Sequence, residues 1–170
     1  MIQEDIKILV VEDELIWQKA LELNLRELGF DIVAIATNSD EALPIITTNN
    51  FDVAILDINI GGKSSGIDLG RIIHSLNNKP FIFITGSTDS HTMDEAVKAQ
   101  PSAYLLKPAN KTSLLVAIQN AIENYQQKQQ PAYVKPTDTN DFIFVKQGNK
   151  YKKYSGKMYF CLVVRVSTLN

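Results

Sequence analysis

Val53-Ala54-Ile55-Leu56-Asp57 is the stretch that decides the fold of this 170-residue chain, because four apolar residues end in one carboxylate. A short apolar run of this kind is typical of a strand that is buried on both faces of a parallel sheet. A charge at its end is costly unless water, an opposite charge or a cation stabilises it. Because ligands of open α/β sheets bind outside the carboxyl ends of the strands, Asp57 is predicted to be a functional residue.

Three other apolar segments also end in side chains with useful chemistry. They are residues 7–11, followed by Glu12 and Asp13; residues 80–84, followed by Thr85; and residues 103–106, followed by Lys107. If these segments are parallel strands of one sheet, their ends converge on one edge. We therefore expect an acidic pair, an acidic acceptor, a hydroxyl and an ammonium to lie together there.

Strand and helix patterns alternate along the first three quarters of the chain. The predicted strands are 7–11, 32–36, 53–57, 80–84 and 103–106, and the predicted helices include 39–48, 66–76, 89–99 and 110–128. A further helix carries Trp17, Leu21, Leu25 and Leu28 at helical spacing, which predicts a core stripe, and Gly29 ends it. This alternation predicts an α/β fold with a five-stranded parallel sheet, doubly wound and flavodoxin-like. Pro44 is awkward inside the helix at 39–48.

The composition indicates one ordinary domain with an appendage, since 45% of the residues are hydrophobic and 21% are charged. Residues 129–140 are predicted to be a linker, and residues 141–170 a short β-prone tail. Residues 1–130 carry 10 Lys/Arg and 17 Asp/Glu, a net charge of −7, whereas residues 131–170 carry 7 and 2, a net charge of +5. The basic tail indicates either a polyanion partner or a solvated lysine-rich segment.

The sequence does not have the features expected of a membrane protein, a secreted protein or a disulfide-bonded protein. No apolar run approaches the roughly 18 residues of a membrane span, so we expect no membrane partner. The acidic start at residues 1–5 does not resemble a signal peptide. The single cysteine, Cys161, cannot form an internal disulfide, which favours a cytoplasmic location.

The expected edge of the sheet has the chemistry of phosphoryl transfer. Three carboxylates, Glu12, Asp13 and Asp57, would repel one another, and a divalent cation would relieve the repulsion. Hard oxygen ligands suit Mg²⁺. An oxygen of Asp57 could attack phosphorus and form an aspartyl phosphate. Mg²⁺ and Lys107 would neutralise the transferred group, and Thr85 could donate a hydrogen bond to it.

Residues 5–128 resemble the receiver domain of a two-component response regulator. The matching segments are residues 8–14 (ILVVEDE), 54–58 (AILDI), 84–86 (ITG) and 103–108 (AYLLKP). The resemblance implies that Asp57 is the phosphoacceptor. It also implies Mg²⁺ ligands, a switch pair, a phosphate-pairing cation and a cis peptide bond. The implied Mg²⁺ ligands are Glu12, Asp13, Asp57 and the backbone carbonyl of Asn59. The switch pair is Thr85 with the rotating aromatic Tyr104. Lys107 is the phosphate-pairing cation, and the bond from Lys107 to Pro108 is the cis peptide bond.

The resemblance further implies a signalling protein rather than an enzyme, with at most self-phosphorylation from small donors and self-dephosphorylation. A histidine kinase would donate the phosphoryl group. Phosphorylation would repack the face formed by residues 89–99, 103–106 and 110–128 and promote a homodimer through it. One departure is the loop after Asp57, residues 58–69, where Gly61 replaces a common proline and where many receivers reach their glycine one residue sooner.

The tail supports an alternative. Residues 141–151 (DFIFVKQGNKY) resemble the start of a LytTR-type DNA-binding domain, but such a domain needs roughly a hundred residues. The resemblance thus implies a truncated effector domain, and DNA binding only with a complete one. Two alternatives stay open, a DNA-binding transcription regulator and a pseudo-receiver that works only as an interaction module without phosphorylation.

Overall fold

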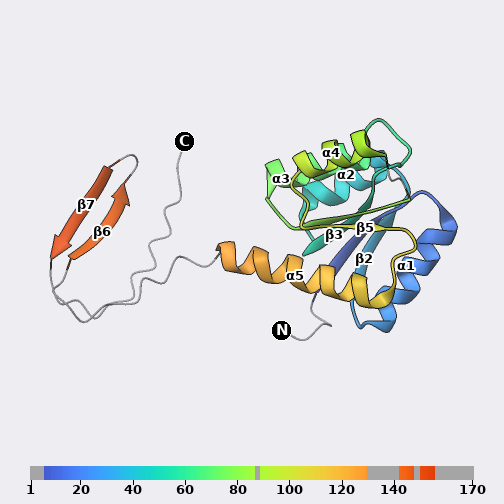
Figure 1. The fold of residues 1–170 in the computed structure, drawn as a ribbon, viewed down its shortest axis with the longest axis horizontal. Helices are drawn as coiled ribbons and strands as arrows, with labels where there is room; N and C mark the ends of the chain where they lie inside the picture. The colour runs from blue at the N-terminus through green and yellow to red at the C-terminus, as the bar shows by residue number, and fades with distance from the viewer. Residues whose placement is uncertain (1–5, 87–88, 130–141, 148–149, 156–170) are drawn as a thin grey trace. The chain divides into compact units, whose positions relative to one another are not determined.

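The structure is a computed structural model that describes residues 6–86, 89–129, 142–147 and 150–155, the last two ranges as backbone only. The chain divides into two units, residues 1–131 and 132–170. Strands and helices alternate through the first unit (Figure 1). Its elements are β1 (Lys7–Val11), α1 (Leu15–Glu27), β2 (Asp31–Ala36), α2 (Ser39–Thr48), β3 (Val53–Asp57), α3 (Gly66–Leu76), β4 (Phe81–Thr85), α4 (Ser90–Lys98), β5 (Ala103–Leu106) and α5 (Lys111–Gln129).

The five strands form one parallel sheet in the order β2-β1-β3-β4-β5. The chain leaves β1 to build β2 on one side and then returns to build β3 on the other side. The boundary between β1 and β3 is therefore the point at which the strand order reverses, where doubly wound sheets bind ligands. Every residue of β3 and β4 is buried, as expected for the central strands of such a sheet. The predicted fold class is confirmed.

Helices cover both faces of the sheet, with α2, α3 and α4 grouped on one side and α1 and α5 on the other (Figure 1). Leu21 of α1 and Ile118 of α5 pack in one hydrophobic cluster, and Ile46 of α2 and Ile73 of α3 pack in the other. Of the stripe predicted from helical spacing in α1, Leu21 and Leu25 are buried, whereas Trp17 and Leu28 are half-buried. Within the described part of the chain, no helix is long and apolar enough to cross a bilayer.

Pro44 lies inside α2, and the helix continues through it to Thr48 as predicted. Proline cannot donate the hydrogen bond that the carbonyl of Asp40 would accept one turn earlier. Both Pro44 and Asp40 are exposed, so water can solvate that carbonyl. The position of the proline on the solvent side explains why the helix tolerates it.

The second unit contains a two-stranded antiparallel sheet of β6 (Phe142–Gln147) and β7 (Lys150–Ser155). Phe142 pairs with Ser155 and Gln147 pairs with Lys150, which is the register of a hairpin. Gln129, the first residue of the predicted linker, still belongs to α5, and residues 130–140 lie outside the described residues. The resemblance of the tail to a LytTR domain stays a prediction.

Candidate functional site

The strand ends converge as the sequence predicted. Asp57 and Thr85 are the last residues of β3 and β4, while Glu12 and Lys107 directly follow β1 and β5. The register aligns these ends, because Asp57 pairs with Ile84 in the neighbouring strand. The parallel sheet thus brings to one edge four residues that are far apart in the sequence.

Lys107 connects the two buried carboxylates of this edge. Its Nζ lies 2.7 Å from Asp57 Oδ2, and 2.9 and 2.7 Å from Oε1 and Oε2 of Glu12. The side chains of Lys107, Glu12 and Asp57 are only 4%, 0% and 5% exposed. A buried ammonium between two carboxylates is stable only with its partners in place, so the three groups form one electrostatic unit.

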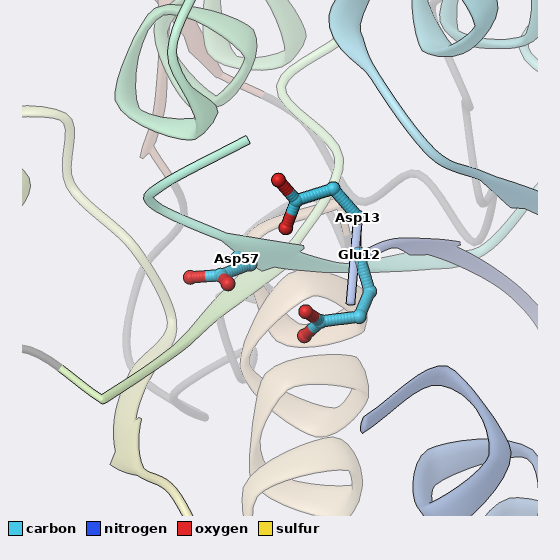
Figure 2. A group of neighbouring side chains, drawn as sticks. All are labelled: Glu12, Asp13 and Asp57. Carbon is cyan, nitrogen blue, oxygen red and sulfur yellow. The ribbon is translucent and has the colours of Figure 1, made fainter. Parts of the chain in front are cut away.

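Asp13 completes a group of three carboxylates around a shared space, drawn in Figure 2. Oxygen atoms of Glu12, Asp13 and Asp57 all lie within 4.8 Å of one another. Glu12 Oε2 is buried and accepts no hydrogen bond of good geometry from the described residues, although the Lys107 ammonium is close. Two buried carboxylates and one exposed carboxylate offer oxygen ligands that fit a hard divalent cation.

The electrostatics of the edge appear in the pKa values of its members. Burial raises the pKa of Glu12 above its ordinary value, the hydrogen bond from Lys107 opposes this, and the charge of Asp57 adds to it. For Lys107, burial alone would lower the pKa, but the hydrogen bonds and charges of Asp57 and Glu12 outweigh it and raise the pKa. Since three carboxylates, Glu12, Asp13 and Asp57, share this edge with one ammonium, a divalent cation would complete the charge balance.

The residues assigned to the switch lie beside this unit. Thr85 is fully buried, and its backbone carbonyl accepts a hydrogen bond of 2.9 Å from the Lys107 N–H. Tyr104 of β5 is half-buried and packs on the side of the sheet that α4 covers. Burial, and then the charge of Asp57, raise the pKa of the Tyr104 hydroxyl. The bond from Lys107 to Pro108 is cis, as the resemblance implied.

The unusual loop after β3 is fastened to the start of α2. The N–H of Asn59 donates to Asp57 Oδ1 at 3.2 Å, and Asn59 itself is exposed. Farther along, Gly61 accepts a hydrogen bond of 3.0 Å from the N–H of Ser39, and the Ser39 hydroxyl accepts one of 3.0 Å from the N–H of Ser64. Gly62 has a φ of 107° and is in contact with Ser39, which explains why glycine is needed there. The role of the Asn59 carbonyl as a metal ligand stays a prediction.

Two contacts from the first turn of α1 were missed by sequence reasoning. The side-chain amide of Gln18 donates to the carbonyl of Glu12 at 2.6 Å, and the ring of Trp17 lies 5.5 Å from Lys107 Nζ. The sequence predicted Trp17 to be a core residue, but it is only half-buried, and its ring faces the site. Helical spacing predicts which face of a helix a residue such as Trp17 lies on. It does not predict that a side chain from elsewhere in the fold, here Lys107, contacts that face.

The chain is similar to known receiver domains. The family described as "Response regulator receiver domain" matches residues 8–119. The chain is 32% identical over 120 residues to the chemotaxis protein CheY of Pseudomonas aeruginosa, covering 69% of this chain and 96% of that protein. It is 29% identical over 121 residues to the transcriptional regulatory protein PdtaR of Mycobacterium tuberculosis, covering 71% of this chain and 58% of PdtaR.

The chain is also similar in structure to solved receiver domains and response regulators. The signal receiver domain of a modulated diguanylate cyclase from Desulfovibrio desulfuricans superposes with a TM-score of 0.70 at 30% identity, over 73% of this chain and 99% of that one. A response regulator from Burkholderia pseudomallei superposes with a TM-score of 0.61 at 29% identity, over 74% of this chain and 73% of that one. That protein was crystallised with a phosphorylated aspartic acid, a calcium ion and citrate.

Proposed function

Because the chain belongs to the response regulator receiver domain family, we propose that it is the phosphoacceptor switch of a two-component system, with Asp57 as the acceptor. The observation that carries this proposal is the buried Asp57 carboxylate, paired with Lys107 at 2.7 Å and within 4.8 Å of two further carboxylates. A buried acid placed between a cation and a divalent-cation site is suited to accept a phosphoryl group and to stabilise it afterwards.

The transfer starts at an oxygen of Asp57. As the new O–P bond forms, the P–N bond of a histidine kinase's phosphohistidine breaks, and the imidazole leaves with the bonding electron pair and takes up a proton from solvent. The N–H of Asn59 orients Asp57 Oδ1, and Lys107 holds Oδ2. After the transfer, the Lys107 ammonium pairs with the phosphoryl group and neutralises part of its charge.

Glu12, Asp13 and Asp57, with the carbonyl of Asn59, would hold Mg²⁺. When bound, Mg²⁺ supplies positive charge to the oxygens of the transferred group. We propose that the protein is not an enzyme toward other molecules, since its phosphoryl chemistry is confined to its own aspartate. We also propose a cytoplasmic location, because Cys161 leaves no internal disulfide to form.

The proposed output is a change in the face formed by α4, β5 and α5. The added charge draws the Thr85 hydroxyl toward the phosphoryl group and lets Tyr104 repack, which biases a two-state element. These three elements carry four exposed large apolar side chains, namely Met93 (41% exposed), Val97 (67%), Leu106 (50%) and Val116 (48%). Exposed apolar side chains of this kind suit a homodimer. An unchanged sedimentation mass with beryllofluoride and Mg²⁺ would count against it.

The test of the acceptor is intact mass after incubation with a small phosphodonor, with and without Mg²⁺. We expect one Mg²⁺-dependent phosphoryl adduct in the wild type and none in Asp57→Asn. The matched control is Asp31→Asn, because Asp31 is exposed and starts β2 at the opposite end of the sheet. An adduct that persists in Asp57→Asn would refute the assignment. No adduct from any donor or kinase would favour the pseudo-receiver alternative.

A second candidate function, DNA binding, rests on the tail. Residues 131–170 carry a net charge of +5, and β6 and β7 form an antiparallel hairpin that includes most of the segment whose sequence resembles the start of a LytTR-type domain. We propose that the tail belongs to such an effector domain. A gel-shift titration at low and high salt tests it, and no shift at low salt would remove this function for the chain as it stands.

A further inference from the structure

We propose that Trp17 is a positioning residue for Lys107, holding its ammonium at the site through a cation–π contact; this rests on the proposed function of Lys107. The Lys107 Nζ lies over the Trp17 ring, 5.5 Å from the ring centroid. This is within the roughly 6 Å at which an ammonium is attracted by the negative face of an aromatic ring. Trp17 is the only tryptophan of the chain.

The turn of α1 that carries the ring is fixed by hydrogen bonds. The N–H groups of Trp17 and Gln18 both donate to the carbonyl of Glu14 at 3.0 Å, and the Gln18 side chain donates to the Glu12 carbonyl at 2.6 Å. The turn that carries the indole is therefore tied to the segment that carries one carboxylate partner of Lys107. A ring on such a turn can orient the ammonium without rearranging.

The Trp17 ring adds a third contact to the ammonium beside its two charged partners. Carboxylate oxygens of Glu12 and Asp57 lie 2.7 Å from Lys107 Nζ, and the Lys107 side chain is only 4% exposed. The half-buried indole contributes to the exclusion of water without adding a competing charge. A third carboxylate in that place would pair with the ammonium and draw it away from Asp57, whereas an aromatic face attracts it weakly and leaves it available to a phosphoryl group.

The first experiment measures phosphorylation of Asp57 from a small phosphodonor with Mg²⁺, in the wild type, Trp17→Phe and Trp17→Leu. A cation–π contact predicts a rate loss of roughly two- to thirty-fold in Trp17→Leu and partial rescue in Trp17→Phe. Tyr125→Leu is the control, because Tyr125 is also half-buried but lies in α5, outside the site. Equal rates in Trp17→Leu and the wild type would overturn the proposal.

The second experiment does not depend on phosphorylation, so it separates this proposal from the proposed function. Fluorinated tryptophans of increasing fluorine content replace Trp17, which weakens the negative face of the ring with little change of shape. We expect a graded fall in the urea midpoint of unfolding, and the fall should disappear in Lys107→Met if that variant folds. Flat midpoints across the series would overturn the proposal. A graded fall without any Asp57 adduct would retain the contact and refute only the phosphoacceptor function.

Discussion

Removal of the Lys107 ammonium is the perturbation whose effect follows most directly from the structure. Lys107→Met keeps the aliphatic stem and removes the charge that lies 2.7 Å from both Glu12 and Asp57. At an effective dielectric constant of about 20, the Glu12 and Asp57 carboxylates, whose oxygens lie within 4.8 Å of each other, then repel by at least about 3.5 kcal/mol. Breaking a buried ion pair by removing one partner costs about 3–5 kcal/mol in general, so both estimates agree.

The loss of folding stability in Lys107→Met should become larger as the pH rises. The pKa of Glu12 is already raised above its ordinary value of 4.5 in the wild type, and the loss of Lys107 raises it further. The folded variant then binds a proton at pH values where the unfolded chain does not, so its stability falls as the pH rises from 4.5 through the raised folded pKa. Below the unfolded pKa the deficit relative to the wild type should largely vanish.

The assay is urea unfolding of the wild type and Lys107→Met with a chelator, at neutral pH and near pH 4.5. We expect a deficit of about 3–5 kcal/mol at neutral pH, and partial recovery when Mg²⁺ is added. Lys111→Met is the control, because its partner Glu27 and Lys111 itself are about half exposed, and such surface pairs contribute about 0–1 kcal/mol. A neutral-pH deficit no larger than the control's, or one that is the same at both pH values, would refute the reasoning.

Three further predictions concern the same edge. Gly66→Ala should destabilise the protein by about 1–3 kcal/mol, because a Cβ there would collide with the Asp57 carbonyl. Gly86→Ala should have little effect, because none of the described residues outside its chain neighbours would lie within 4 Å of the new Cβ. Ser65→Ala should cost about 1 kcal/mol in urea unfolding, because it removes the capping box at the start of α3, and a loss near zero would contradict that role. Mg²⁺ at a hundredfold excess over its Kd should stabilise the wild type by about 2.7 kcal/mol. The gain should shrink in Asp13→Asn, and an equal gain there would place the ion elsewhere.

The sequence by itself determined which residues reach the site. Asp57 and Thr85 end apolar segments, and Glu12 and Lys107 follow such segments, so a parallel sheet had to bring them to one edge. The strand and helix ranges were predictable for the same reason, since apolar spacing distinguishes buried strands from amphipathic helices. The predicted ranges of β3, α2 and α3 are those observed.

Only the tertiary structure decided how these residues meet. It buried Glu12 and left Asp13 exposed, although they are neighbours in the sequence, because successive side chains leave the strand end in different directions. It also placed the Trp17 ring over Lys107 and fastened Gly61 to Ser39, contacts between residues 90 and 22 positions apart. Such contacts depend on the rotation of a helix about its axis and on the path of a loop. Packing of the whole domain sets both, and no local pattern encodes them.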